Sequence, residues 1–453
     1  MLLAISCVPA APTVVPDAVR AAPAIELWVD ASGAPDGDGS VNRPLKVLVP
    51  IKGAVMHLRS GLYEGPFVLP DGSRLVGHGE VVLHSAGEVT VTAEGAASLE
   101  ELSVQGGQVG LLGLGALTLR QVHFSGHRRA AVEARVALTL DDSVLDGTVS
   151  GTKGVVLTEG ANARLKKVRF TGAFARAIEG KGATLDAEDV QVEGPASALH
   201  LVDCRAHVRK LGVAGGSGPG VFTSGGALTL TDAAVNGHEF GLQAKKTKLE
   251  VTRFVSKRVA HDGLALLDCS GTLAGIELEQ SAMYLENSEL RVSGVKLRQG
   301  RGNGILIRHG EVKLDDATIE NVRAEGGSGG DAVEIRDAEV EARRLVIRDV
   351  AGIGVFATAS ATVKLDTFLC ERCRIGALVS ENDAVVTVKG MVAKGGEGPA
   401  VAALAHGTVK LDGAELGGTQ APIWAECDEG ARVTVKNLRS TVGQPPTGCI
   451  LRE

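Results

Sequence analysis

One phrase recurs along almost the whole chain, and this repetition constrains the fold more than any other feature. In the stretch Gly304–Val322, a glycine is followed by a short apolar run, a polar turn and two further apolar stretches. The phrase returns in Gly354–Leu365 and in Gly376–Val388. Self-similarity at a fixed period of this size indicates a stack of similar structural units, each too small to bury an apolar face alone.

The residue before each apolar run sets one register for the repeat. Fourteen steps of this register cover 312 residues (422 − 110), which gives a period of about 22 residues. The long step from Gly304 to Ala332 contains the glycine-rich insertion 324–330, which we expect to form a loop. The register positions are Gly110, Ala131, Gly154, Ala177, Ala198, Gly220, Gly241, Gly263, Ala282, Gly304, Ala332, Gly354, Gly376, Ala400 and Pro422.

The runs within each unit alternate apolar and polar residues, as in Ala116–Leu119 and Ala227–Leu230. Alternation with period 2 predicts strands with one face inward, and runs of about 3 to 5 residues are too short for helices. Leucine-rich repeats have a similar period, but their leucine and asparagine ladder is absent from the sequence. The sequence therefore predicts an all-β chain folded as a parallel β-helix, with about 17 coils and a length of roughly 80 Å.

Three segments near the start resemble a known family. Leu27–Leu45, His57–Gly65 and Leu75–Gly79 are similar to the opening of right-handed parallel β-helix proteins of the pectin-lyase-like family. The resemblance covers roughly residues 26 to 440 and implies a right-handed coil. It implies an N-terminal leading strand and cap in residues 25–56, the β-helix in 57–440 and a C-terminal cap in 441–453. Residues Val47–Met56 are expected to form a short helix or strand that plugs the first coil.

Residues 1–24 are predicted to be a signal-like segment and a tether. Met1–Cys7 resembles the end of a bacterial lipoprotein signal, which would make Cys7 the lipidated residue. The segment has no basic residues and a short apolar part, so a chance likeness is the alternative. Val8–Ala24, rich in proline and alanine, then predicts a flexible tether.

The six remaining cysteines are an even number, which suits an oxidising compartment. Cys427 and Cys449 are about one coil apart, within disulfide reach, and are predicted to pin the C-terminal cap. Cys204 and Cys269 lie three coils apart and are predicted to be buried thiols. The lone C-x-x-C motif Cys370–Cys373 is predicted to be a local disulfide or two thiols, in preference to a zinc or redox site.

The charged residues argue against nucleic acid as a partner and offer one candidate site for calcium. The formal net charge of −7 and the pI of about 5.9 give no global basic footprint for nucleic acid. Asp30, Asp36 and Asp38 lie in a glycine-rich turn and are candidate calcium ligands, because calcium prefers carboxylate oxygens. An ordinary Asp/Gly turn is the favoured alternative, so no cofactor other than calcium is expected.

The strongest chemical candidate is a cluster on adjacent coils. Arg308 and Arg336 occupy the same register position and should stack about 5 Å apart, followed by His309 and Asp337. Two adjacent arginines repel each other unless an anion lies between them, and a uronate would fit. One of the two arginines, or His309, would then abstract a proton next to the uronate carboxylate in a lyase reaction. The alternative is a solvated ladder in which Asp337 and Glu334 neutralise the arginines.

Further residues are candidates for binding. Asp331 precedes the second arginine, and Lys245, Lys246 and Lys248, with Lys257–Arg258, form a predicted basic patch that is otherwise a solvated face. Glycine-rich excursions near the end of several units are expected to frame a groove on one side. Aromatic platforms are few: Tyr284 and Trp424 are available, while core packing is predicted for two phenylalanines, Phe222 and Phe356.

Two functions fit these observations, and a purely structural spacer is a third, less favoured alternative. The first is a non-catalytic β-helix of the cell envelope or extracellular space, which presents a rigid surface to a polysaccharide or an envelope protein. The second is a polysaccharide lyase, or a related carbohydrate-active enzyme, that acts on an acidic glycan. The ordered hydrolase motif of the resembled family is not met, because His309–Gly310 precedes Asp315–Asp316. Contact with a membrane is expected only through a lipid on Cys7.

Overall fold

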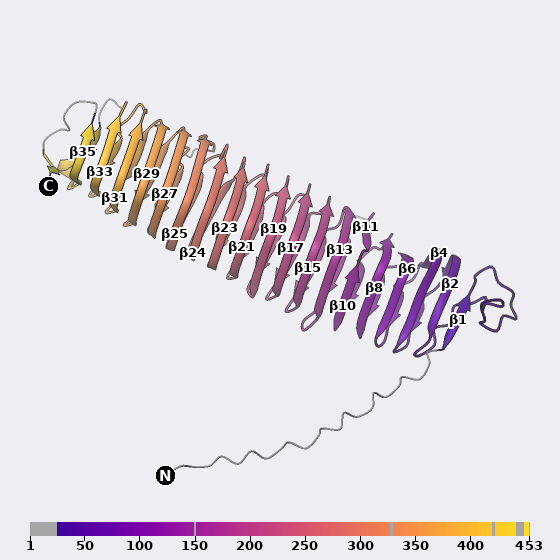
Figure 1. Cartoon of the computed structure of the whole chain (residues 1–453). Coiled ribbons are helices and arrows are strands. Elements are labelled where there is room, and N and C mark those ends of the chain that lie inside the picture. Colours follow the sequence, from indigo (N-terminus) through magenta and orange to yellow (C-terminus); the bar gives the residue numbers. More distant parts are fainter. Residues whose placement is uncertain (1–24, 149–150, 327–328, 419–421, 441–447, 453) are drawn as a thin grey trace, which may run out of the picture.

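The structure, a computed structural model, describes residues 25–148, 151–326, 329–418, 422–440 and 448–452. These residues form a rod of stacked turns, with the first strands at one end and the last strands at the other (Figure 1). The strand pairings within these ranges are parallel. The chain is therefore an all-β parallel β-solenoid of about 17 turns with coils of about 22 residues, as the repeat predicts.

Each turn contributes one long strand, and successive long strands pair in register along the rod. Alternate residues of these strands are buried, as the period-2 pattern predicts. The long strands are β2 (Val55–Glu64), β4 (Ser73–Ser85), β6 (Ala97–Gly106), β8 (Ala116–Ser125), β10 (Ala137–Asp141) with β11 (Val144–Gly147), β13 (Asn162–Gly172), β15 (Thr184–Glu193), β17 (Arg205–Ala214), β19 (Ala227–Asn236), β21 (Lys248–Lys257), β23 (Ser270–Glu279), β24 (Ala282–Arg298), β25 (Ile305–Val322), β27 (Glu339–Val350), β29 (Thr362–Cys373), β31 (Val385–Lys394), β33 (Thr408–Gly417) and β35 (Arg432–Ser440).

A second column, which we call the short-strand sheet, closes each turn. The first halves of β24 and β25 belong to it as well, because these two strands run through the turn without a break. Its separate strands are β3 (Phe67–Leu69), β5 (Val89–Ala93), β7 (Val109–Gly113), β9 (Ala130–Ala134), β12 (Lys153–Leu157), β14 (Arg176–Lys181), β16 (Ser197–Val202), β18 (Val221–Ser224), β20 (Leu242–Lys245), β22 (Asp262–Leu267), β26 (Val333–Arg336), β28 (Ile353–Thr358), β30 (Gly376–Ser380), β32 (Val401–Ala403) and β34 (Ile423–Ala425).

A residue with positive φ bends each long strand near its middle, so that the turn can close around a core. Asp232, Arg253 and Asp316 have φ values of 55°, 54° and 55° at this position. Short polar residues and glycine tolerate the left-handed conformation best, and neighbouring bends are linked by ion pairs. The Nη2 of Arg253 lies 2.8 Å from Asp232 Oδ2, and Arg344 pairs with Asp316 in the same way.

The inward residues of all the strands form one continuous apolar column. Leu230, Val251, Leu273 and Val292 stack in register and are at most 1% exposed. Burial of each such side chain stabilises the fold by about 1.5–3 kcal/mol relative to an exposed one. Because each layer of this column contacts only its neighbours, the long rod has one core rather than several domains.

The N-terminal end differs from the plug that the sequence predicts. β1 (Glu26–Val29) pairs with β2, and residues 46–54 contain turns and irregular backbone instead of a helix or strand. Leu48 is 6% exposed and closes the apolar column, while Val47 and Val49 remain exposed. Leu48 and the fully buried Ala54, both on irregular backbone, therefore close the end of the column where we expected a short element.

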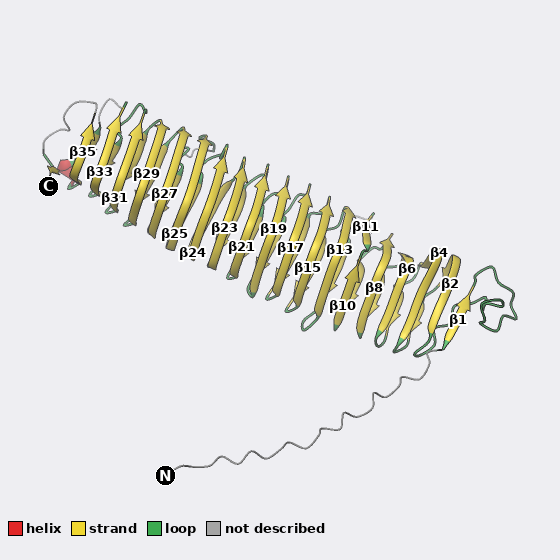
Figure 2. Ribbon diagram, in the orientation of Figure 1, coloured by secondary structure: helices red, strands yellow, loops and turns green. Residues whose placement is uncertain are grey.

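At the other end, β36 (Ile450–Arg452) pairs with β35. The only helix among the described residues is the 3-10 turn Cys427–Glu429, drawn in red in Figure 2. A disulfide joins Cys427 to Cys449, with 5.3 Å between the Cα atoms, so the last strand is tied to the preceding turn. Cys370 and Cys373 also form a disulfide, whereas Cys204 and Cys269 are buried thiols.

Candidate functional site

The outer face of the short-strand sheet carries a column of large side chains. Strand register places His200, Phe222, Tyr284, Leu306 and Phe356 in this column. The rings of His200 and Phe222 are stacked with 4.5 Å between centroids. The prediction that Phe222 and Phe356 pack in the core is wrong. Both point outward and are partly exposed, because the residues on each side of them take the inward positions.

In the middle of this face lies a charged cluster that we call the arginine face: Tyr284, Glu286, Arg308, Glu334 and Arg336. The register pairs Arg308 with Arg336 on adjacent strands, which confirms the stacking that the repeat alignment predicts. Glu286 is paired with Arg308 on the other side. The five side chains come from three neighbouring turns, so the rigid ladder of backbone hydrogen bonds fixes their spacing.

The two arginines have different surroundings. Arg336 forms an ion pair with Glu334, whose side chain is only 4% exposed and also accepts a hydrogen bond from Asn303. The guanidinium carbon of Arg308 lies 6.0 Å from the centroid of the Tyr284 ring. Its Nε is buried and has no hydrogen-bond partner among the described residues. Within this cluster, Arg308 is therefore the side chain with an N–H group that the described residues leave without an acceptor.

Tyr284 is held by its neighbours rather than free to rotate. Its hydroxyl donates a hydrogen bond to Glu286. Burial raises the pKa of Tyr284, and the hydrogen bond to the Glu286 carboxylate raises it further. The phenol therefore stays protonated at neutral pH, and its ring forms a fixed platform beside Arg308.

His309 and Asp337 follow the two arginines and contact each other. Nδ1 of His309 lies 3.1 Å from Asp337 Oδ2, and both side chains are more than half exposed. Both residues have positive φ, which places them in the turn that follows the short strands. The structure thus brings together all four predicted catalytic residues on one rim, and it pairs Asp337 with His309 and Glu334 with Arg336.

Asp331 lies at the opposite end of the same strands. Its Oδ1 accepts a hydrogen bond from the backbone N–H of Ile353 at 2.7 Å, and the residue is 7% exposed. Burial raises the pKa of its carboxyl group. Asp331 ties two neighbouring turns together, and its role in ligand binding stays a prediction.

The predicted basic patch is divided by the fold. Lys245, Lys246 and Lys248 are exposed in the turn between β20 and β21. Lys257 and Arg258 lie at the far end of β21, where Lys257 pairs with Glu279 at 3.0 Å. The prediction of one continuous patch is therefore wrong, because residues at the two ends of a long strand cannot share a surface.

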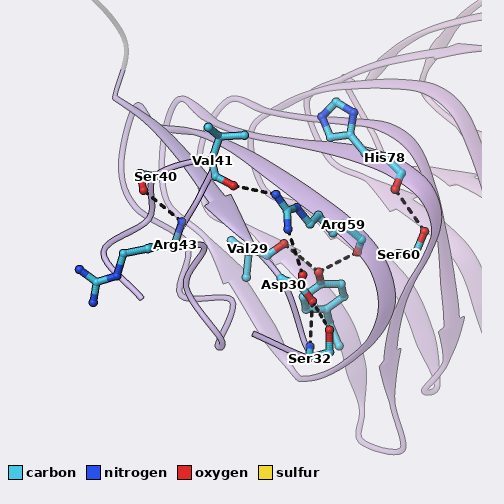
Figure 3. Close-up of polar contacts among 10 residues, drawn as sticks. Val29, Asp30, Ser32, Ser40, Val41, Arg43, Arg59, Ser60 and His78 are labelled. Atoms are coloured by element: carbon cyan, nitrogen blue, oxygen red, sulfur yellow. Dashed lines mark hydrogen bonds and ion pairs between the residues drawn. The ribbon is translucent and has the colours of Figure 1, made fainter. Parts of the chain in front are cut away.

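The three aspartates proposed as calcium ligands each have an arginine partner, and Figure 3 shows the contacts of Asp30 with Arg59 and Ser32. Asp30 contacts Arg59 at 3.4 Å and also accepts hydrogen bonds from Ser32, while Arg43 pairs with both Asp36 and Asp38. The hydrogen bonds from Ser32 lower the pKa of Asp30. Within the described ranges, no group of three or more His, Cys, Asp or Glu side chains is arranged to hold a metal ion. Calcium binding here stays a prediction.

Cys7 and the rest of residues 1–24 lie outside the described residues. In the part of the chain that the structure describes, no helix is long and apolar enough to span a bilayer.

Two residues of the site were missed at the level of sequence. Glu286 sits four residues after Ala282, the same offset that identified Arg308 and Arg336, so the repeat register contained the signal. Asn303 directly precedes its register glycine, as Asp331 precedes Ala332. The contact of Asn303 with Glu334 depends on side-chain direction, which register does not give.

Comparisons with known proteins add little. No protein-family model matches the chain, and no curated protein matches its sequence. A rhamnogalacturonan lyase is 11% identical, with 82% of each chain covered and a TM-score of 0.18. The catalytic unit of a GH87 alpha-1,3-glucanase from Streptomyces thermodiastaticus strain HF3-3 is 13% identical, with 89% of this chain and 71% of that chain covered and a TM-score of 0.26.

The A-module of the mannuronan C-5 epimerase AlgE4 from Azotobacter vinelandii is 13% identical, covers 86% of this chain and 91% of that chain, and has a TM-score of 0.18. Similarities this weak carry no argument about function. The class of protein is defined by the strand pairings themselves: the chain is a parallel β-solenoid with a charged and aromatic outer face.

Proposed function

We propose that this protein is a non-catalytic β-solenoid of the cell envelope or extracellular space that binds an acidic glycan through the arginine face. The observation that carries the proposal is Arg308. Arg308 is paired in register with Arg336, its guanidinium lies beside a fixed tyrosine ring, and its Nε has no hydrogen-bond partner among the described residues. A carboxylate of a uronic acid residue would complete the hydrogen bonding of this group.

The surroundings favour recognition of an anion over proton abstraction by the arginines. The buried carboxylate of Glu334 holds Arg336 through its Nε and Nη2, so the guanidinium of Arg336 is fixed in place and Arg308 is the arginine left to contact an anion. Tyr284 offers a ring on which a sugar can rest, because its hydroxyl is already occupied by Glu286. Partial fixation of these side chains before binding lowers the entropic cost of association.

The disulfides support the location in this proposal. Cys370–Cys373 and Cys427–Cys449 are both bonded, and structural disulfides persist mainly in secreted and envelope proteins. A lipid on Cys7 would anchor the rod to a membrane surface. Nucleic acid is not an expected partner, because the net charge is −7.

The alternative function, a polysaccharide lyase, is favoured by one observation. His309 and Asp337 form a pair in which a carboxylate orients an imidazole, the arrangement that a general base uses. In that case His309 would remove the proton next to the uronate carboxylate while Arg308 and Arg336 stabilise the developing negative charge.

Binding of polygalacturonate to the whole protein, measured by titration calorimetry with and without calcium, tests the proposal. Arg308 has no ion pair with a buried carboxylate, so Arg308→Gln removes the guanidinium without leaving a buried charge unpaired. The substitution should weaken binding at least tenfold, which is about 1.4 kcal/mol. Arg253→Gln is the matched control, because it removes an exposed, ion-paired arginine from a different face.

Ultraviolet absorbance of the same mixtures separates the two functions. Binding without an absorbance increase supports the glycan-binding protein. An increase that His309→Gln abolishes would show lyase chemistry instead. If polygalacturonate does not bind, or if Arg308→Gln binds it as well as the wild type does, the arginine face is not the site, and an envelope protein becomes the expected partner.

A further inference from the structure

A second concave region lies on the side of the rod where the turns lead into the short strands. It consists of two adjoining open hollows of about 560 and 370 Å³ that share Val259, Ala260, Gln280 and Arg301 in their walls, and we call the two together the loop groove. The groove begins beside Gly216 and ends beside Glu325. Of the glycine-rich excursions expected to frame a groove, only 215–218 contributes to this lining.

The length of the loop groove follows from the stacking. It crosses six successive turns, which are five steps of about 4.8 Å, or roughly 24 Å in all. None of its residues belongs to the arginine face, which begins two residues after the groove-lining Ala282, at Tyr284. The groove is therefore a separate candidate site and does not depend on the function of Arg308.

Asp262 is the unexplained residue in the wall of the groove. It directly precedes the register residue Gly263, and among the described residues its carboxylate receives no hydrogen bond and only the electrostatic attraction of the adjacent His261. Its neighbour His261 is instead 3.8 Å from Glu239. Burial raises the pKa of Asp262 from 3.8 to about 6. A partly buried carboxylate without donors is costly, and such groups concentrate at binding sites.

A second, independent observation comes from His238 in the same wall. Its side chain is 2% exposed, Nδ1 lies 3.1 Å from the carbonyl oxygen of Gly218, and Nε2 has no partner among the described residues. The wall of the groove thus contains one partly buried acceptor, the Asp262 carboxylate, and one fully buried imidazole nitrogen that has no partner among the described residues. Buried polar groups that lack a protein partner form their hydrogen bonds with a ligand or with ordered water.

The charges around the groove indicate which ligand would complete it. Arg258 and Arg301 line it together with the carboxylates of Glu239, Asp262 and Glu325. A long polyanion would be repelled by the carboxylates, and a long polycation would be repelled by the arginines. Hydroxyl groups both donate and accept hydrogen bonds. A ligand rich in hydroxyls can donate to Asp262 and accept from Arg301 and from the second amide hydrogen of Gln280, whose Nε2 already donates to Gln299 at 3.1 Å.

We propose that the loop groove is a second binding site, specific for a neutral glycan segment, with Asp262 as the central acceptor and with Gln280 and Arg301 as donors. One rod would then hold an acidic glycan on the arginine face and a neutral glycan in the loop groove. Both sites lie on rigid strands or on the turns next to them, so their spacing is fixed by the stack.

The test uses the whole protein and three neutral glucose hexamers that differ only in linkage: maltohexaose, cellohexaose and laminarihexaose. Titration calorimetry at pH 7.5 should show binding of at least one hexamer. Asp262→Asn keeps the shape but removes the charged acceptor, and should weaken this binding at least tenfold. Asp268→Asn is the matched control, because Asp268 is exposed in the same turn of the solenoid and has positive φ, which asparagine tolerates.

Ala260→Trp provides a test that does not depend on charge. Ala260 is exposed and lines both cavities, so a tryptophan there fills the shared section without disturbing the core. It should abolish hexamer binding and leave polygalacturonate binding unchanged, whereas Arg308→Gln should do the opposite. The proposal is overturned if no hexamer binds at millimolar concentration, or if hexamer binding survives both Asp262→Asn and Ala260→Trp.

Discussion

Replacement of Asp262 by asparagine is expected to stabilise the protein at neutral pH. The folded-state pKa of Asp262 is raised from 3.8 to about 6 because its carboxylate is desolvated. Below pH 3.8 the group is protonated in both the folded and the unfolded state. Between pH 3.8 and 6 the unfolded chain releases the proton while the folded chain keeps it, so stability falls as the pH rises through this window.

The size of the effect follows from the shift. A difference of 2.2 pKa units (6 − 3.8), at 1.36 kcal/mol per unit, gives about 3 kcal/mol of destabilisation above pH 6. Asparagine cannot ionise, so Asp262→Asn should recover most of this free energy at pH 7.5 and none near pH 3.8. The amide still needs hydrogen bonds, which makes about 3 kcal/mol an upper bound.

Hydrogen exchange of the backbone amides in β20, β22 and β24 is the appropriate assay. A long solenoid opens locally, and exchange reports the free energy of that opening for each strand. The variant should protect these three strands more strongly than the wild type at pH 7.5, with equal protection near pH 3.8 after correction for intrinsic rates. Asp268→Asn should change neither value by more than about 0.5 kcal/mol.

Two results would refute this reasoning. Equal protection at pH 7.5 would mean that the Asp262 carboxylate finds partners in solution, and would remove the support that its burial gives to the loop groove. A gain in protection from exchange that persists at low pH would show that the shape of the side chain, and not its ionisation, is responsible.

Three further changes test the fold. Phe254→Ala, at a fully buried position, should destabilise the central turns by about 3–5 kcal/mol in urea unfolding, whereas Phe222→Ala on the outer face should cost less than about 1.5 kcal/mol. Cys449→Ser should lower the protection of β35 from exchange by up to about 3 kcal/mol and leave β19 unchanged, because the disulfide constrains only the last turn. Gly226→Ala should cost more than about 1 kcal/mol, measured by thermal unfolding, since φ is +67° and the new Cβ would lie 2.0 Å from a backbone oxygen; normal stability would contradict the assigned backbone conformation.

Much of the architecture was determined by the sequence itself. The alternation of apolar residues every second position and the return of the phrase every 22 residues or so leave few alternatives to a stack of parallel strands, because each unit can bury its inner face only against its neighbours. The same register predicted that Arg308 would stack on Arg336 and that Cys427 would come within reach of Cys449. The hand of the coil came only from the family resemblance.

Only the tertiary structure decided which side of the rod each residue faces and what it contacts. Register is linear, so it could not show that Phe222 and Phe356 point outward or that the two halves of the basic patch lie at opposite ends of β21. It also could not show the pairing of Arg336 with Glu334, the buried Nε of Arg308 or the unpaired carboxylate of Asp262. These properties depend on burial and side-chain direction, which arise when neighbouring turns and their loops close around one another, and they are the properties from which both proposed sites follow.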